Sequence, residues 1–485
     1  MLGEKSQIGE KRGSSVLAIK AGFWYVVSIF LVKAIGFITT PIFSRLMNKA
    51  DYGEFSNFAS WQLTLLIITS AELYNTVSRA YYDFTEDFDC YLSTITFTSC
   101  GITLLTYIFF LLGQSVLSKI VTIPEKYIHL MFLVLLFQAI KQIYFARERT
   151  LYRYKTVATV SFFNLFIPTI MAIFLVFFFP DADRLALRLY GFYVPTAIIG
   201  AFCAIPIFAN RIFFKWQYCK YAFILSIPLL IHHLTTYLLL ASNIIVTKAV
   251  LGSEITAIVS IANSTIHIIT VFFQAVAGAL TTWLMDNLKQ NQLGIVKEGS
   301  LRYVLLLAFC SIGVMLIAPE VVLLLGGKQY SASVFLIPGF IFAVFIQSVT
   351  TIFTIILTYS KSVVRIALFT TVIAVFGVVG KVLLLKNFGY DELPCINVIA
   401  FAILFMFNYY LIKKVGYVNA VNIRNIVLIL LIMGVITVSV LKLYSHDSFR
   451  YGVLFVYVLV FGLVLTVNRK GIMNLLRKRR CTKSD

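Results

Sequence analysis

Charged residues are scarce in this sequence, and acidic ones are the scarcest. Asp, Glu, Lys and Arg make up 13% of 485 residues, with 21 acids in total, whereas 60% of the chain is hydrophobic. No polar stretch is long enough to fold as a separate soluble domain, so this composition excludes a soluble globular protein. Hydrophobic runs of about 20 residues, the length of a membrane-crossing helix, follow one another instead. We therefore predict an all-α, polytopic membrane protein with about 14 transmembrane helices.

Cysteine is also sparse and follows no pattern. The seven cysteines are scattered without a CxxC pair, which argues against a disulfide framework and against a metal site. The motifs GxxxxGK[ST], HExxH and GxSxG are absent as well, so no built-in ATPase or common hydrolase is indicated. We expect no cofactor, no metal and no enzymatic activity, and a function that moves a substrate across the membrane.

The excess of basic residues indicates the topology. Lys and Arg total 41 and give a net charge of +20. Because cytoplasmic loops collect Lys and Arg, their distribution between the predicted spans places both termini on the cytoplasmic side. The basic tail at 477–480 suits contact with anionic lipid headgroups, and no domain is available to bind nucleic acid.

A basic stretch divides the predicted spans into two unequal sets. The simplest partition has two six-helix lobes around a central cavity and a C-terminal helix pair, an arrangement common among transporters. The predicted parts are a cytoplasmic N-terminal segment (1–20), the first lobe (21–209), a cytoplasmic linker (210–220), the second lobe (221–412), the helix pair (413–467) and a basic cytoplasmic tail (468–485).

Three charged residues are assigned to the spans themselves: Lys33, Glu72 and Lys141. A charge at mid-helix costs about 2.5–3.5 kcal/mol on insertion scales, so such residues face the bundle interior or a water-filled cavity. Arg79 follows Glu72 by seven residues and would share its face of a continuous helix. This spacing predicts a proton or cation site beside a substrate-binding cation, with a structural ion pair or an interfacial Glu as the alternative.

The remaining polar candidates are weaker. Lys33 and Lys141 carry the compact charge that suits a phosphate, although Lys141 lies near a span end and would also be able to snorkel to the headgroups. His232 and His233 are adjacent in the seventh span. Adjacent residues point about 100° apart on a helix, so the pair is a poor metal site, and one ring would face the cavity while the other bonds a neighbouring helix.

Three stretches go beyond the general features of membrane proteins. They are TPIFSRL with DYGEF (40–55), SIPLLIHH (226–233) and APE through LGGKQY (318–330). In this order they resemble the first-helix exit, the seventh-helix Pro–His segment and the ninth-to-tenth helix connection of bacterial oligosaccharide-lipid flippases. These form the Wzx-type family of the multidrug/oligosaccharidyl-lipid/polysaccharide (MOP) exporter superfamily, which the chain resembles over nearly its full length in span count and order.

The resemblance implies a transporter that turns undecaprenyl-diphosphate-linked oligosaccharide repeat units from the cytoplasmic to the outer leaflet of the cytoplasmic (inner) membrane. These units would serve cell-surface polysaccharide biosynthesis, such as lipopolysaccharide O-antigen or capsule. Cavity cations would bind the diphosphate, and the candidates are Lys33, Arg45, Arg79 and Lys141. The implied partners are the lipid-linked oligosaccharide, membrane lipids, a coupling ion (H⁺ or Na⁺) and polysaccharide polymerase or assembly proteins.

One position departs from the family. Many relatives carry an Asp–Arg pair late in the seventh helix, where this chain has Asn243 and Ile244. Glu72 is therefore the main coupling-ion candidate, with His232, His233 and Asn243 as polar cavity candidates. Three alternatives stay open: a cation-coupled multidrug exporter, a lipid II exporter of the same superfamily, and a membrane polysaccharide polymerase or ligase. The first would need more acids in the lobes, and the last a sizeable outer loop.

Overall fold

The computed structural model describes residues 35–179, 181–209, 213–360 and 362–467 of the chain. No strand occurs among these residues, and ten helices are long and apolar enough to cross a bilayer. The bent helix α9 adds an eleventh if its two halves form one span. The all-α, multi-pass membrane class is thus confirmed, while the count of about 14 spans stays a prediction.

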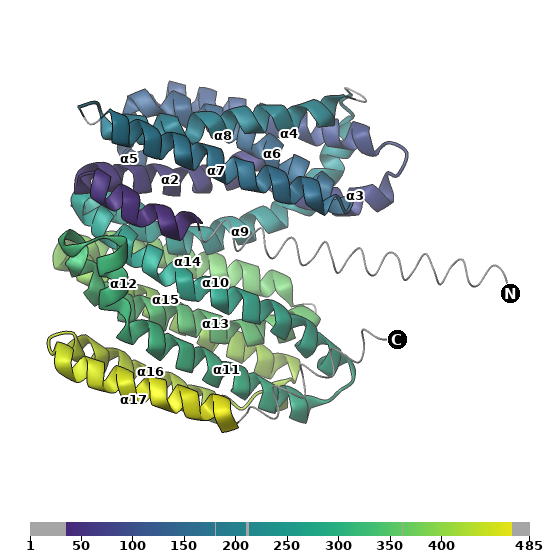
Figure 1. The fold of residues 1–485 in the computed structure, drawn as a ribbon. Helices are drawn as coiled ribbons and strands as arrows, with labels where there is room; N and C mark the ends of the chain where they lie inside the picture. The colour runs from purple at the N-terminus through teal and green to yellow at the C-terminus, as the bar shows by residue number, and fades with distance from the viewer. Residues whose placement is uncertain (1–34, 180, 210–212, 361, 468–485) are drawn as a thin grey trace.

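The helices form two groups, drawn above and below one another in Figure 1. Residues 35–46 are helical and precede the first group. That group contains α2 (Lys49–Ser70), η1 (Leu73–Thr76), α3 (Val77–Asp83), α4 (Phe88–Leu112), α5 (Gln114–Val121), η2 (Glu125–Tyr127), α6 (Ile128–Thr150), α7 (Tyr154–Phe178) and α8 (Arg184–Phe208).

The second group begins after the long helix α9 (Trp216–Leu251). Its outermost helices, α16 and α17, lie farthest from the first group (Figure 1). The group contains α10 (Ser253–Lys289), α11 (Leu293–Leu316), α12 (Ala318–Leu325), η3 (Lys328–Leu336), α13 (Ile337–Tyr359), α14 (Val363–Phe388), η4 (Tyr390–Glu392), α15 (Leu393–Val415), η5 (Val418–Ala420), α16 (Ile423–Leu443) and α17 (Asp447–Val467). The residue boundaries proposed for the lobes stay a prediction.

Helix α9 belongs to both groups. Its first half places Tyr218 and Ala222 in a hydrophobic core with α3, α4 and α6, and the Tyr218 hydroxyl donates to Asp87 Oδ2 at 2.7 Å. Its second half places Leu239 and Val246 in the core of the second group. The helix bends by 45° between these halves. A rotation of one group against the other would therefore act on this bend.

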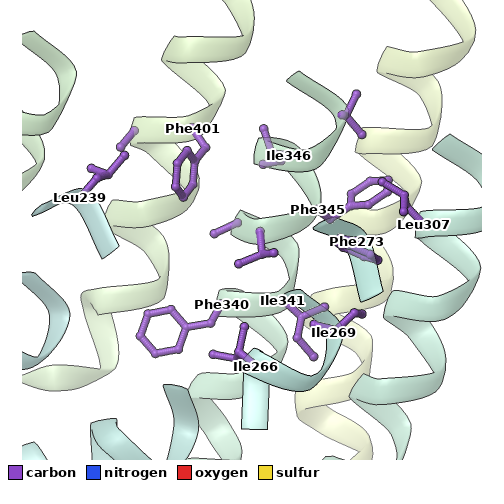
Figure 2. Close-up of a cluster of buried hydrophobic side chains, with 14 of the residues drawn as sticks. Leu239, Ile266, Ile269, Phe273, Leu307, Phe340, Ile341, Phe345, Ile346 and Phe401 are labelled. Carbon is purple, nitrogen blue, oxygen red and sulfur yellow. The ribbon is translucent and has the colours of Figure 1, made fainter. Parts of the chain in front are cut away.

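Close packing holds the helices together, because lipid tails are as apolar as the core and give little hydrophobic driving force between helices. Gly200 of α8 shows this: a Cβ there would lie 2.5 Å from the carbonyl oxygen of Phe137 in α6, so the backbones meet where a side chain is absent. In the second group, Phe345 of α13 and Phe401 of α15 are buried in the same hydrophobic cluster as Ile266 of α10 (Figure 2). The two groups also meet in one core, because Phe43, Met47 and Tyr52 belong to the same hydrophobic cluster as the buried residues of the second group.

Candidate functional site

A cavity of about 530 Å³ lies between the two helix groups. One wall comes from α2 and α8, with Tyr52, Ser56 and Arg188, and the facing wall comes from α9, α10, α13 and α15. Along α10 the lining changes from the buried Ser260 to the exposed Gln274. The cavity therefore opens toward the end of α10 that the predicted orientation places on the cytoplasmic side. A concave site with few polar groups on an apolar wall is the usual form of a ligand site.

Among the described residues, Arg188 is the one Arg, Lys, Asp or Glu in this lining, and the start of α8 sets its position. Asp183 caps the helix: its Oδ1 accepts from the Ala186 backbone N–H at 3.0 Å, and its Oδ2 accepts from Lys126 Nζ at 2.8 Å. Burial alone would raise the pKa of Asp183, but these hydrogen bonds outweigh burial and hold the pKa below its usual value. The ionised cap fixes the helix register that brings Arg188 to the cavity.

The Arg188 guanidinium lies in an aromatic cage and is paired with no described carboxylate. Its Cζ lies 3.5 Å from the ring centre of Phe55, 4.1 Å from that of Phe43 and 5.0 Å from that of Tyr52. Its Nη1 donates to the weak acceptor Met47 Sδ at 3.4 Å, and its buried Nε has no hydrogen-bond partner in the described chain. The side chain therefore keeps donors for an anion, and guanidinium groups bind phosphate bidentately.

A smaller cavity of about 150 Å³ is also lined by Arg188. It is enclosed by the helix at 35–46 together with α7 and α8, and Thr39 and Thr169 are among its lining residues. Arg188 thus lines two spaces within the membrane-spanning region. Burying a charge at mid-helix costs about 2.5–3.5 kcal/mol, which makes such a residue a functional candidate by default.

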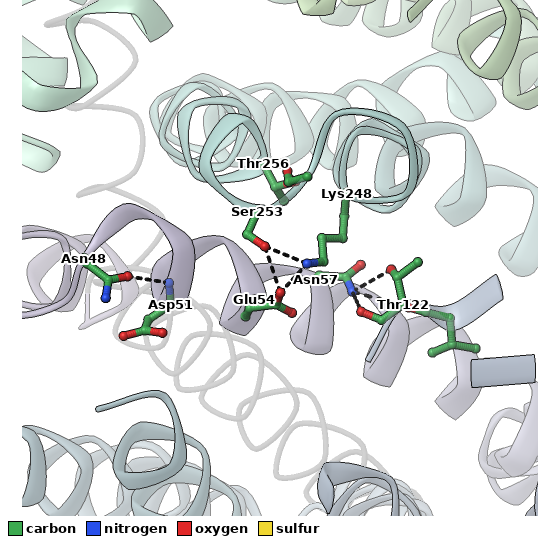
Figure 3. Close-up of polar contacts among 10 residues, drawn as sticks. Asn48, Asp51, Glu54, Asn57, Thr122, Lys248, Ser253 and Thr256 are labelled. Atoms are coloured by element: carbon green, nitrogen blue, oxygen red, sulfur yellow. Dashed lines mark hydrogen bonds and ion pairs between the residues drawn. The ribbon is translucent and has the colours of Figure 1, made fainter. Parts of the chain in front are cut away.

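The end of the cavity that is predicted to face outside is closed by polar contacts between the groups (Figure 3). Lys248 Nζ of α9 donates to Glu54 Oε1 of α2 and, at 2.6 Å, to Ser253 Oγ at the start of α10. Ser253 Oγ donates to Glu54 Oε1 at 2.8 Å. We call these three residues the outer latch. The neighbouring Gly53 lets the backbones meet, because a Cβ there would lie 1.9 Å from the carbonyl oxygen of Ser253.

Glu72 lies outside a continuous helix, so the predicted face shared with Arg79 is wrong. Helix α2 ends at Ser70, and Ala71 and Glu72 have positive φ angles of 46° and 55°. The Glu72 carboxylate is 3% exposed; its Oε2 accepts from Asn75 Nδ2 at 2.5 Å and lies 2.7 Å from His233 Nδ1 of α9. The structure therefore brings together two predicted candidates from distant parts of the chain, the coupling-ion candidate and a polar cavity candidate.

Three of the four predicted cations lie apart from the described cavity lining. Arg45 is exposed and donates to the carbonyls of Leu323 and Leu324 at the end of α12, at 3.3 and 3.0 Å. Arg79 is exposed and pairs with Asp83 across one helical turn. Lys141 is buried in the first group, where it donates to Asn164 Oδ1 at 2.7 Å. Each has a partner on its own or a neighbouring element, and their role in substrate binding stays a prediction.

Two further predicted residues fall outside what the structure describes, namely Lys33 and the side chain of His232. Asn243, in contrast, lines the cavity, as predicted for a polar candidate. It is 2% exposed, and its Oδ1 accepts from Asn397 Nδ2 at 3.2 Å.

Several buried cations were missed from the sequence, and two of them, Arg188 and Lys381, lie beside the cavity or the bend of α9. Arg188 and Lys381 lie within hydrophobic runs, near the ends of α8 and α14, so their charge was assigned to the flanking loops. Lys381 is fully buried, and its Nζ donates to Leu239 O at 2.8 Å and to Ser242 Oγ at 2.7 Å, both in α9 just beyond the bend. The aromatic residues of 43–55 were a usable signal for Arg188, because a lone membrane cation needs a partner such as a ring face.

The fold and the cavity together define a helical membrane protein of the transporter type. Residues 18–284, more than half of the chain, match the family described as "Polysaccharide biosynthesis protein", and the chain belongs to this family. A search of curated proteins by sequence returned no match.

Solved structures share the fold at low sequence identity. The lipid II flippase MurJ in an inward closed conformation has a TM-score of 0.69 at 12% identity, covering 92% of this chain and 99% of that chain. An inward-facing multidrug resistance MATE family transporter of the MOP superfamily has a TM-score of 0.55 at 13% identity, covering 80% and 95%. A MATE structure in complex with MaD3S has a TM-score of 0.50 at 11% identity, covering 82% and 96%. The chain therefore shares the fold of these transporters, as the resemblance predicted.

Proposed function

We propose that this protein flips undecaprenyl-diphosphate-linked oligosaccharide repeat units from the cytoplasmic to the outer leaflet for cell-surface polysaccharide biosynthesis. The observation that carries the proposal is Arg188, a buried guanidinium in a cavity between two helix groups that is paired with no carboxylate of the described chain. A diphosphate supplies the anion that this site lacks, and the family is one of polysaccharide biosynthesis.

Transport follows from alternating access. In the conformation described, the outer latch closes one end of the cavity, while Gln274 and the neighbouring part of α10 are exposed at the other end. The diphosphate enters from the cytoplasmic leaflet and binds Arg188. The groups then rotate about the bend of α9, the latch separates, and the headgroup leaves on the outer side.

Glu72 and His233 are the candidates for coupling the cycle to an ion. A carboxylate and an imidazole 2.7 Å apart share a proton readily, and both lie between α9 and the break that follows α2. We therefore assign the coupling role to H⁺ rather than Na⁺ in this proposal. The site joins the first group to the half of α9 that precedes the bend, so a change in its charge acts on the hinge.

In this proposal the protein lies in the cytoplasmic (inner) membrane with both termini in the cytoplasm. Polysaccharide polymerase or assembly proteins act on the units after they are flipped. O-antigen and capsule are both destinations for such units. An enzyme reading is disfavoured because the family's fold relatives in the MOP superfamily are transporters. A multidrug exporter for cations is disfavoured because the described cavity lining holds one Arg and no Asp or Glu.

The test is the leaflet position of undecaprenyl-diphosphate-linked oligosaccharide in cells with and without the protein. Deletion, and Arg188→Met, should trap the lipid-linked unit on the cytoplasmic face. Arg302→Met removes an exposed Arg that pairs with Glu298 and should leave flipping intact. If units still reach the outer face in the deletion strain but remain unpolymerised, the protein acts after flipping and the proposal fails.

A further inference from the structure

The two walls of the central cavity differ in chemistry. The wall from α2 and α8 carries the single cation, Arg188. The facing wall, from α9 and three helices of the second group (α10, α13 and α15), carries carboxamides and no described Asp, Glu, Lys or Arg. Its five carboxamides are Asn243, Asn263, Gln274, Gln347 and Asn397.

Most of the polar lining on this wall follows one helix. Ser260, Asn263, His267, Thr270 and Gln274 of α10 all line the cavity. Their spacing of three and four residues places them on one face of the helix, which we call the α10 stripe. At 1.5 Å per residue the stripe is about 21 Å long.

The other face of α10 is apolar. Ile269 and Phe273 are buried in the core of the second group (Figure 2). The α10 stripe is therefore a polar track on a helix that is otherwise packed into the second group.

The carboxamides that face the cavity are free to bind a ligand. Asn263, Gln274 and Gln347 make no side-chain hydrogen bond to any described residue, and Gln274 is exposed. Asn397 is 2% exposed and donates to Asn243, and its own Oδ1 has no partner within the described chain. Each carboxamide both donates and accepts, which matches sugar hydroxyl and acetamido groups. A free ammonium would find no carboxylate on this wall.

We propose that the α10 stripe is the glycan subsite and that it takes uncharged sugars bearing hydroxyl and acetamido groups. The inference rests on the proposed function, because it places the diphosphate at Arg188 and the sugars along the facing wall. Asn263 and Gln274 are then specificity-determining residues, and sugars with a free amino group are disfavoured.

The experiment measures binding to the purified full-length protein in nanodiscs. Three probes are compared: undecaprenyl diphosphate, its N-acetylglucosamine conjugate, and the conjugate with the acetyl group removed. The stripe variants are Asn263→Leu and Gln274→Met, which keep the approximate side-chain volume. Asn287→Leu is the matched control, since Asn287 lies on the same helix outside the cavity lining.

The acetylated conjugate should bind the wild type more tightly than the other two probes. Each stripe variant should lose about fivefold affinity for this conjugate, the equivalent of one neutral hydrogen bond, and retain wild-type affinity for undecaprenyl diphosphate. Arg188→Met should weaken all three probes, and Asn287→Leu none. If the stripe variants weaken all probes equally or none, the glycan subsite is refuted while the flippase proposal stands. If the wild type binds no probe, the proposed function itself fails.

Discussion

Replacing Gly53 by Ala should prevent the outer end of the cavity from closing. The new Cβ would lie 1.9 Å from the Ser253 carbonyl oxygen and 2.8 Å from its carbonyl carbon, both rigid backbone atoms. The oxygen contact must lengthen by at least 1.1 Å to reach 3.0 Å, the shortest distance that real Cβ atoms tolerate. Helix α2 and the start of α10 must therefore move apart at the outer latch.

Gly53→Ala therefore removes the outer-latch contacts that stabilise the state in which the outer end of the cavity is closed. A hydrogen bond to a charged group contributes about 1.5–3 kcal/mol, so losing the Lys248–Glu54 contact alone lowers the closed-to-open ratio about 10- to 100-fold. The variant should consequently spend most of its time with the cavity open to the outside. Transport should fall, because the cycle has to pass through the closed state.

Cysteine accessibility measures this shift. Ser260, buried at the latch end of the cavity and 2.8 Å from Ser56 Oγ, is replaced by Cys in a background without the native cysteines. A membrane-impermeant thiol reagent added from outside should label Ser260→Cys slowly alone and rapidly when combined with Gly53→Ala. Gly101→Ala is the control, since a Cβ at Gly101 meets no atom within 4 Å. Unchanged labelling and transport in Gly53→Ala would refute the reasoning.

Three further predictions concern buried charges. Glu72→Gln should abolish the pH dependence of transport while leaving the protein folded, because the Glu72–His233 pair can no longer hold an exchangeable proton. The assay is transport in proteoliposomes as a function of pH, and an unchanged pH profile would contradict the coupling role. Arg450→Met should destabilise the protein by about 1.5–3 kcal/mol, the contribution of hydrogen bonds to a charged group, because Arg450 is 2% exposed and forms two hydrogen bonds with Glu320 at 2.7 and 2.6 Å. Thermal unfolding in detergent measures the loss, and an unchanged Tm would contradict it. Lys381→Met should slow transport with little change in expression, because the carbonyl of Leu239, beside the bend of α9, loses its hydrogen-bond donor. Single-turnover flipping in proteoliposomes measures the rate, and a wild-type rate would show that the bend does not need this hydrogen bond.

The fold class could be predicted from composition because a bilayer allows few alternatives. Backbone polar groups in lipid have to be satisfied within the chain, so successive apolar runs of about 20 residues become helices. The break after α2 could not be predicted in the same way. Ala71 and Glu72 adopt positive φ angles without Gly or Pro to mark the site, and the contact from α9 to Glu72 comes from 161 residues away.

The type of residue at the candidate site could be predicted from the sequence, but its position in the chain could be predicted only in part. A membrane cation for an anionic substrate was expected, yet Arg45, Arg79 and Lys141 have other partners and Arg188 occupies the described cavity. The position of a cation within a hydrophobic run does not show whether its side chain snorkels to the headgroups or is buried. Burial depends on which helices pack beside that residue. The rings around Arg188 come from α2 and the helix before it, more than 130 residues earlier.

The sequence alone determined that the chain is helical, membrane-spanning and poor in acids, since hydrophobicity and charge act locally along a helix. Only the tertiary structure decided which face of each helix lines the cavity. Lipid and protein core are both apolar, so even a helix with a polar stripe, such as α10, does not show in its sequence which helices stand opposite that stripe. The α10 stripe became a cavity wall, Arg188 a lining residue opposite it and Glu72 a partner of His233 only when the two helix groups came together.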